Sequence, residues 1–210
     1  MVSWRAASPV IGFDLDLTLL DARDGIRASL AALSAETGVA VDAELVVSRL
    51  GPPLETELAN WFPAADVPAA AARYRQLYAV HALPASAPMP GATEAVAAVR
   101  ALSGRVVVVT AKATALARAS LRHIGIHADV IEGDRFADTK GVSVLAHQVD
   151  VFVGDHAGDM LGARHGGALA VGVATGPHAA DELRAAGAAI VLADLHQFPP
   201  WLAAEAARRR

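Results

Sequence analysis

The chain of 210 residues contains no cysteine. Disulfides, catalytic thiolates and cysteine-ligated zinc or iron–sulfur centres are therefore excluded, which leaves oxygen-ligated metal as the favoured inorganic partner. Long apolar runs are also absent: hydrophobic residues make up 54% of the sequence, but no run approaches the roughly 18 residues needed to span a bilayer. The N-terminal residues Met1–Arg5 do not lead into an export signal. We expect a soluble, cytoplasmic protein that does not bind membranes.

Excess positive charge is lacking as well. The formal net charge is −4, and the terminal Arg208–Arg210 is too short to provide a nucleic-acid surface, so we expect a solvated tail and no nucleic-acid partner. A chain of this length can form one domain with a modest insertion.

Short apolar segments alternate with helical patterns along most of the chain. Such βα alternation, with near-continuous Val/Ile runs, predicts an α/β fold with a doubly wound parallel sheet covered on both faces. We expect strands at Val10–Phe13, Arg105–Thr110, Ala128–Ile131, Val151–Gly154, Ala168–Val173 and Ala189–Leu192, and connecting helices at Thr93–Leu102 and Ala113–Ile124.

The stretch 22–88 interrupts this alternation and contains no convincing strand. Its periodicity predicts helices at Arg23–Glu36, Ala43–Arg49, Leu54–Asn60 and Ala69–Leu83, and the prolines from Pro84 to Pro90 predict a return hinge. We therefore expect an all-helical insertion in the α/β core.

Acidic and phosphate-binding residue types follow the predicted strands. Asp14 and Asp16 end the first strand, and Thr110 ends the second. Ligands bind at the carboxyl ends of strands in open α/β sheets, and two close carboxylates favour a cation. Three further residues complete the candidate set, namely Lys140, Asp155 and Asp159.

In this order the residues resemble the signatures of the haloacid dehalogenase-like (HAD) superfamily: D-x-D-x-T at 14–18, a strand-end Thr110, Lys140, and G-D-x-x-x-D at 154–159. The finer resemblance is to the phosphoglycolate phosphatase-like branch, through Pro90-Gly91, Thr110-Ala111-Lys112 and Gly51-Pro52-Pro53-Leu54. The resemblance implies a Rossmann-like core of residues 1–21 and 89–210 with a helical cap domain of residues 22–88.

The resemblance also implies a mechanism. Asp14 is the expected nucleophile, forming an aspartyl phosphate, and Asp16 is the expected general acid and base. Thr110 and Lys140 would bind the phosphoryl oxygens. The expected cofactor is Mg²⁺, with ligands from Asp14, Asp16 through its backbone carbonyl, Asp155 and Asp159.

These expectations describe a Mg²⁺-dependent phosphatase acting on a small phosphorylated metabolite, phosphoglycolate-like or a sugar phosphate, as a monomer or homodimer. Alternatives of the same fold are a 2-haloacid dehalogenase, for which the extra carboxylates would be superfluous, and a phosphomutase. A non-catalytic phosphate-binding module is a further alternative. No G-x-G-x-x-G follows the first strand, which argues against a dinucleotide site.

Some positions stay open at this point. His156 and Leu17 depart from the branch: His156 is interpreted either as a contact to the leaving group or to Asp155, or as a surface residue. Lys112 is either an active-site residue or an exposed residue at a helix start. In the predicted cap, the residues that contact substrate cannot be ranked among Arg23, Arg49 and Glu55.

Overall fold

The computed structural model describes residues 8–208. Residues 1–7, where we expect no export signal, and residues 209–210 of the arginine tail lie outside the described part. Six parallel strands form the main sheet in the order β5-β4-β1-β6-β7-β8. The α/β prediction with a doubly wound parallel sheet is thereby confirmed. The strands are β1 (Val10–Phe13), β4 (Arg105–Val109), β5 (Val130–Glu132), β6 (Val151–Gly154), β7 (Leu169–Val173) and β8 (Ile190–Leu192).

Helices cover both faces of this sheet. Because successive strand residues point to opposite faces, Val106 and Val108 pack with one buried cluster, while Val107 and Val109 pack with the other. All four valines are fully buried, as expected for a central parallel strand. The first cluster includes α5 (Ala92–Ala101), α6 (Thr114–His123) and α10 (Phe198–Arg208), and the second includes α7 (Asp138–Ala146), α8 (Ala157–His165) and α9 (Ala180–Ala185).

The position of β1 determines where the candidate residues meet. This strand pairs with β4 on one side and β6 on the other. Asp14, Thr110 and Asp155 directly follow these three strands. Since the strands are parallel, all three residues lie at the same edge of the sheet.

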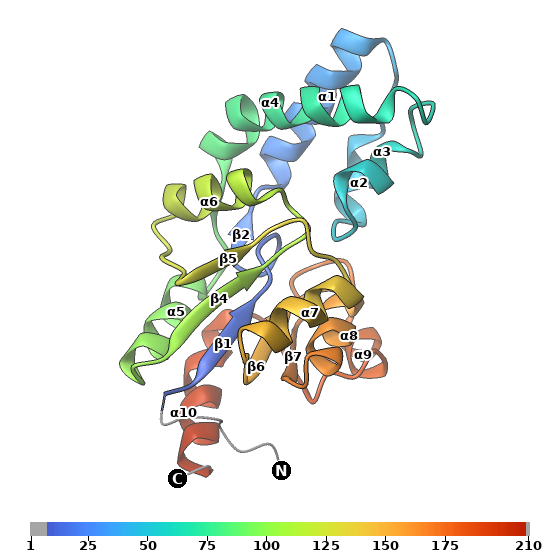
Figure 1. The fold of residues 1–210 in the computed structure, drawn as a ribbon. Helices are drawn as coiled ribbons and strands as arrows, with labels where there is room; N and C mark the ends of the chain where they lie inside the picture. Colours follow the sequence, from blue (N-terminus) through green and yellow to red (C-terminus); the bar gives the residue numbers. More distant parts are fainter. Residues whose placement is uncertain (1–7, 209–210) are drawn as a thin grey trace.

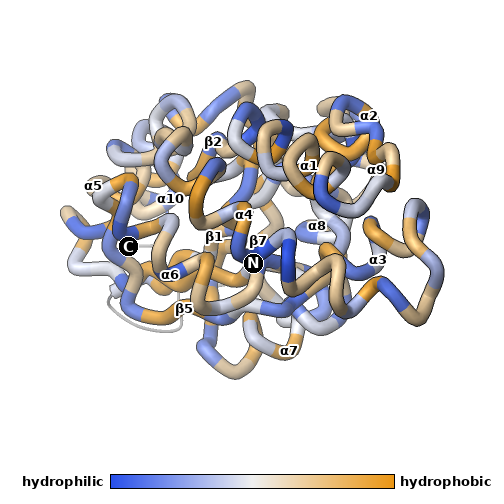
Figure 2. The backbone as a smooth tube through the Cα atoms, turned by 90° about the horizontal axis from the view of Figure 1, so that it is seen from above, coloured by the Kyte–Doolittle hydropathy of each residue, from blue (hydrophilic) through white to orange (hydrophobic). Residues whose placement is uncertain are grey.

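A group of four helices lies beyond the carboxyl ends of the strands (Figure 1). These helices, which we call the helical insertion, are α1 (Arg23–Thr37), α2 (Ala43–Ser48), α3 (Leu54–Leu58) and α4 (Val67–Ala85). A short antiparallel ribbon of β2 (Leu20–Asp21) and β3 (Ala87–Pro88) joins both ends of the insertion to the core. Hydrophobic and hydrophilic segments alternate along the backbone (Figure 2), as expected for helices with one buried face.

Two sequence predictions in the insertion are wrong. Helix α4 continues through Pro84 to Ala85 instead of ending before the proline, and the stretch predicted to lack strands contains β3. Pro84 removes only one backbone hydrogen bond in the last turn, and the Ser86 hydroxyl donates to the Ala82 carbonyl there at 2.7 Å. A two-residue strand is too short to produce a periodic pattern.

No helix within residues 8–208 is both long enough and apolar enough to cross a membrane.

Helices α1 and α4 pack most closely at Gly25. A Cβ atom at this position would lie 2.2 Å from Ala82 Cα, so only glycine permits the contact. Intrinsic helix propensity alone would make Gly25→Ala stabilising by about 1 kcal/mol. Overpacking costs about 1–3 kcal/mol, and we therefore expect a net loss of stability in urea denaturation. A stabilised variant would contradict the close packing of α1 against α4.

Candidate active site

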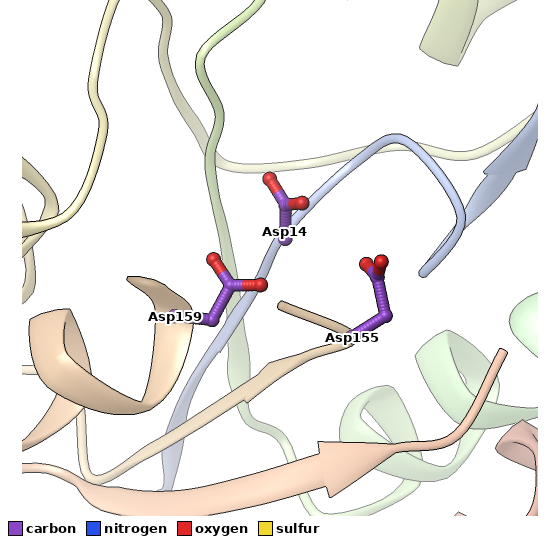
Figure 3. A group of neighbouring side chains, drawn as sticks. All are labelled: Asp14, Asp155 and Asp159. Atoms are coloured by element: carbon purple, nitrogen blue, oxygen red, sulfur yellow. The ribbon is translucent and has the colours of Figure 1, made fainter. Parts of the chain in front are cut away.

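Three carboxylates meet at the carboxyl end of the sheet. Asp14 follows β1, Asp155 follows β6 and Asp159 lies in the first turn of α8. Their side chains point toward one another (Figure 3), and one oxygen from each lies within 4.8 Å of the others. All three residues are buried. Like charges at this separation in a buried site require a cation to balance them.

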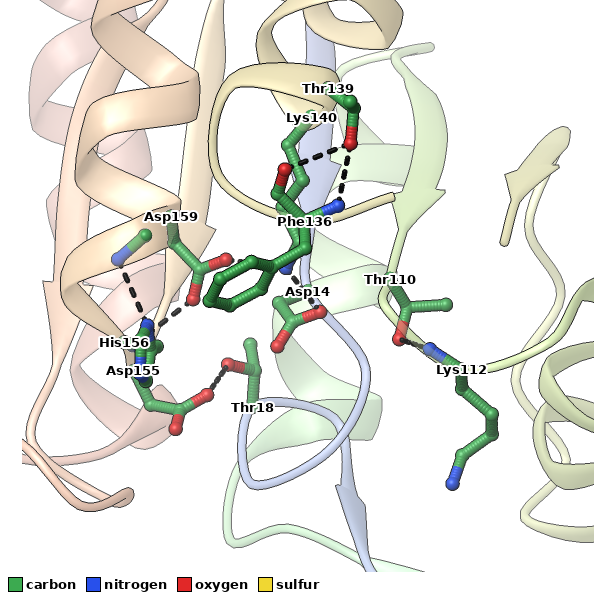
Figure 4. A network of polar contacts seen from close by, with 11 residues as sticks. Asp14, Thr18, Thr110, Lys112, Phe136, Thr139, Lys140, Asp155, His156 and Asp159 are labelled. Carbon is green, nitrogen blue, oxygen red and sulfur yellow. Dashed lines mark hydrogen bonds and ion pairs between the residues drawn. The ribbon is translucent and has the colours of Figure 1, made fainter. Parts of the chain in front are cut away.

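Lys140 provides part of that balance. Its Nζ atom lies 2.8 Å from Asp14 Oδ1 and 2.5 Å from Asp159 Oδ1. The lysine reaches the site from the start of α7, where the Thr139 hydroxyl donates to the Phe136 carbonyl and accepts from the Phe136 N–H (Figure 4). Burial lowers the pKa of Lys140, but the carboxylates of Asp14 and Asp159 outweigh it, so the net shift is upward. The ammonium group is therefore charged at neutral pH.

The loop after β1 is tied to the loop after β6. The Thr18 hydroxyl donates to Asp155 Oδ1 at 2.7 Å. Leu17 lies in the left-handed region, with φ of 59°, a conformation that costs a residue with a Cβ about 1–2 kcal/mol. The Leu17 N–H donates to the Leu20 carbonyl, and the Leu17 carbonyl accepts from the Thr175 hydroxyl. These bonds hold Leu17 in this left-handed conformation.

His156 caps helix α8 and contacts the insertion. Its Nδ1 atom accepts from the Gly158 N–H at 2.9 Å, and Asp159 Oδ2 accepts from the His156 N–H at 3.0 Å. Burial and the neighbouring His178 lower the pKa of His156 to about 4, so the ring is neutral. A Cβ atom at Gly51 would lie 2.5 Å from the His156 ring. The interpretation as a surface residue is wrong, because this ring packs between the core and the insertion.

Asp16 lies outside the cluster of three carboxylates and forms an ion pair with a second lysine, Lys112. Lys112 Nζ lies 3.0 Å from Asp16 Oδ1 and 4.1 Å from the centre of the Tyr78 ring. Burial raises the pKa of the Asp16 carboxyl, and the opposing effect of Lys112 does not cancel it. The Asp16 carboxylate is not one of the three clustered groups. A metal contact through its backbone carbonyl stays a prediction.

Thr110 and Lys112 lie together where β4 ends. Thr110 is buried, and its Oγ1 atom accepts from the Lys112 N–H at 3.2 Å, as drawn in Figure 4. This leaves the hydroxyl proton available for an oxygen of a ligand. Both residues line a cavity of about 110 Å³ that also includes Asp14, Asp16 and Asp155.

The donor set fits a hard divalent cation. Three carboxylates face one ammonium group, which leaves an excess of negative charge in a buried place. Burial raises the pKa of Asp155 well above its usual range, and the charges of Asp14 and Asp159 add to the shift. Oxygen ligands of this kind suit Mg²⁺ or Ca²⁺ rather than softer metals. The arrangement is therefore compatible with a divalent metal.

Comparison with known proteins identifies the family. The model of the haloacid dehalogenase-like hydrolase family matches residues 11–173. The chain belongs to this family. This match confirms the predicted membership of the HAD superfamily and the predicted class of enzyme, a HAD-like hydrolase.

Three individual proteins illustrate the similarity. Tyrosine-protein kinase PtkA of Mycobacterium tuberculosis is 32% identical over 196 residues, covering 84% of this chain and 67% of the relative. Probable phosphatase IndB of Dickeya dadantii is 29% identical over 204 residues, covering 88% and 89%. The crystal structure of a predicted phosphoglycolate phosphatase from Haemophilus somnus superimposes with a TM-score of 0.78 at 18% identity, covering 96% of this chain and 99% of the other. This last likeness shows a shared fold.

Sequence reasoning missed part of the site. For Lys112 the sequence leaves both an active-site role and an exposed position at a helix start open, and the structure excludes the exposed position, because its side chain is 9% exposed and paired with Asp16. Its spacing of two residues from Thr110 is the sequence signal that favours the active-site role. Tyr78 gave no such signal, because its approach to Lys112 depends on how α4 packs against α6. Among the residues of the insertion that the sequence offers as substrate contacts, Arg49 lines the cavity. Arg23 does not line it and pairs with Asp21 instead.

Replacement of Lys140 by Met tests the charge balance. Removing one partner of a buried ion pair costs about 3–5 kcal/mol. Burial already raises the folded-state pKa of Asp14, and without the ammonium it rises further above the unfolded value of about 4. The folded variant then holds protons that its unfolded state has lost, so the stability deficit grows as pH rises above about 4. Urea denaturation at pH 5.5 and pH 8 measures this.

The matched control is Arg184→Met, which removes an exposed ion pair with Asp181. We expect this change to alter stability by no more than about 0.5 kcal/mol at either pH. A Lys140→Met deficit as small as the control, or independent of pH, would contradict the charge balance.

Proposed function

We propose that the protein is a Mg²⁺-dependent phosphatase that hydrolyses a small phosphorylated metabolite through an aspartyl phosphate on Asp14. The observation that supports this most is the meeting of Asp14, Asp155 and Asp159 next to a cavity, with Lys140 in contact with Asp14 and Asp159. Membership of a hydrolase family and the similarity to a relative named as a probable phosphatase agree with it.

Asp14 performs the first displacement. Its carboxylate attacks phosphorus, and the bond between phosphorus and the leaving-group oxygen breaks. Asp16 donates its proton to the departing oxygen, a task for which a raised pKa is suited. In the second displacement Asp16 takes a proton from water, the water oxygen attacks phosphorus, and Asp14 is released as a carboxylate.

The phosphoryl oxygens need positive charge and hydrogen-bond donors throughout. Lys140 supplies an ammonium group that is already fixed beside the nucleophile, and Thr110 supplies a hydroxyl proton. Asp14, Asp155 and Asp159 would hold the Mg²⁺, with the backbone carbonyl of Asp16 as a further ligand. When bound, this ion supplies the remaining charge neutralisation at the phosphoryl group. Thr18 keeps Asp155 oriented by its hydrogen bond.

The helical insertion acts in this proposal as a cap domain of residues 22–88 on a core of residues 1–21 and 89–210. Its Gly51 and Pro52 line the cavity beside Asp14, and the His156 ring packs against Gly51 from the core. Closure at this contact keeps bulk water away from the phosphoryl group. The short ribbon of β2 and β3 is the connection about which such a cap would move.

Other reactions of the same nucleophile are less consistent with these residues. A haloacid dehalogenase has no use for a general acid or for two further buried carboxylates, whose burial is costly without a bound cation. A phosphomutase would return the phosphoryl group to its substrate instead of to water. A kinase, as one relative is named, would transfer phosphate from a nucleotide to a tyrosine.

Phosphate release tests the proposal. With Mg²⁺ and a panel of phosphomonoesters, we expect turnover that Asp14→Asn reduces by about 10³-fold or more, with an unchanged circular dichroism spectrum. Asp181→Asn, an exposed change far from the carboxylates, is the matched control and should keep full activity. If no ester releases phosphate, or if transfer from ATP to tyrosine is the only reaction found, the proposal is wrong.

Thermal unfolding tests the metal site independently of activity. Saturating Mg²⁺ at about 100 times its Kd stabilises the folded state by about 2.7 kcal/mol, which corresponds to a rise in Tm of about 5–10 °C. Because burial raises the pKa of Asp14 and Asp155, protons compete with the ion at low pH. We therefore expect a larger shift at pH 8 than at pH 5.5.

Asp155→Asn should abolish the Mg²⁺ shift without lowering the Tm in the absence of metal. The amide oxygen still accepts from Thr18, and one of three repelling charges is removed. Asp181→Asn should retain the full shift. A Mg²⁺ effect that persists in Asp155→Asn would place the ion elsewhere.

A further inference from the structure

The cavity beside Asp14 has two chemically different ends. The core end presents Asp14, Asp16, Thr110 and Asp155, which are the groups assigned above to the phosphoryl chemistry. The opposite end is formed by the helical insertion and is mostly apolar. Its walls include Ile26, Leu30, Val46, Leu54, Tyr74 and Tyr78. A phosphomonoester bound at Asp14 therefore directs its leaving group toward apolar side chains.

The arginines of the cavity wall already form ion pairs with glutamates. Both guanidinium contacts of Arg49 go to Glu57, at 2.9 and 2.6 Å. Arg75 pairs with Glu55 at 2.6 Å. A negatively charged leaving group would have to share one of these arginines with a carboxylate that already balances its charge.

Lys112, the remaining basic residue of the cavity wall, is likewise held, in this case by Asp16. The other cations of the phosphoryl end, Lys140 and the proposed Mg²⁺, are taken up by the clustered carboxylates and the phosphoryl group. An anionic leaving group would therefore lack a partner of opposite charge. This argues against a carboxylate such as that of phosphoglycolate.

A hydroxyl-rich leaving group is also disfavoured. The hydroxyls of a sugar would lose their hydration against Ile26, Leu30 and Leu54, and buried polar groups without partners are unfavourable. The Tyr78 hydroxyl is itself buried and therefore does not supply such a partner.

The cavity is small. Its volume of about 110 Å³ compares with a cavity of about 150 Å³ that takes up benzene in another protein. The cavity therefore encloses a single ring or a short branched chain of the leaving group, and because it is partly open a longer group extends beyond it.

We propose that the part of the leaving group inside the cavity is uncharged and mostly apolar, and that the Arg49–Glu57 pair excludes anionic esters. The inference rests on the phosphatase function proposed above and narrows its substrate class to monophosphates of phenols or hydrocarbon alcohols.

Two isosteric esters test the charge rule on the wild-type protein. The amide of 4-carbamoylphenyl phosphate and the carboxylate of 4-carboxyphenyl phosphate have nearly the same size and differ in charge. We expect kcat/KM to be at least about tenfold higher for the amide ester, and phenyl phosphate to exceed phosphoglycolate, glucose 6-phosphate and nucleoside monophosphates. Equal or better turnover of the charged, sugar or nucleoside esters overturns the inference while leaving the phosphatase function intact. Failure of every ester overturns the phosphatase function instead.

Glu57→Gln tests the residue that enforces the rule. The change frees the Arg49 guanidinium, while the amide oxygen still accepts from Trp61 Nε1, now 2.9 Å from Glu57 Oε1. We expect the preference for the amide ester to fall about tenfold or to reverse. Glu36→Gln is the matched control, because Arg73, its partner on α4 at 2.6 Å, lies outside the cavity wall. This control should leave the preference unchanged.

An unchanged ester preference in folded Glu57→Gln overturns the assignment to Arg49. Thermal melting establishes that the variant is folded. Should Glu57→Gln fail to fold, Glu57→Asp serves as the second variant, since its shorter side chain loosens the same pair and should shift the preference in the same direction. The isosteric comparison on the wild type decides the substrate class in either case.

Discussion

The structure depends on one electrostatic constraint, the burial of three carboxylates that share a single lysine. Asp14, Asp155 and Asp159 come from segments far apart in the sequence, and Lys140 contacts two of them. Their charges are costly away from water and repel one another. This cost is offset in part by Lys140, and the remaining negative charge is compatible with a bound divalent cation. The surrounding loops are shaped by the same constraint, since a hydrogen bond to Asp155 and the cap of α8 fix two of the three groups.

The sheet explains why these residues meet. With β1 in the centre and β4 and β6 on either side, the loops that follow the three strands share one edge. The valines of β4 and the short apolar run of β6 are buried on both faces, which fixes the register of each strand. A carboxylate placed directly after such a strand has little conformational freedom, because the packing of the strand in the core fixes its position. The helical insertion, by contrast, contributes the cavity walls opposite this edge, and in the proposed function its paired arginines select against anionic esters.

Much of this was predictable because the signals are local. Continuous Val runs indicated buried parallel strands, and the spacing of Asp14, Asp16, Asp155 and Asp159 relative to strand ends indicated a common edge. The failures have non-local causes. Pro84 lies in the last turn of α4, where the next residues decide whether a helix ends, and β3 exists only because it pairs with β2. The burial of Lys112 follows from the approach of Tyr78, and the place of His156 follows from Gly51. Neither contact has a sequence pattern of its own.

The central claim is that a divalent ion lies among these carboxylates, and a crystal structure with Mn²⁺ as an anomalous stand-in for Mg²⁺ tests it most directly. The account predicts one strong anomalous peak within bonding distance of Asp14 and Asp155, with Lys140 still in contact with Asp14. A protein saturated with Mn²⁺ whose anomalous map has no peak at this edge of the sheet, or has its peak at another place, would contradict it.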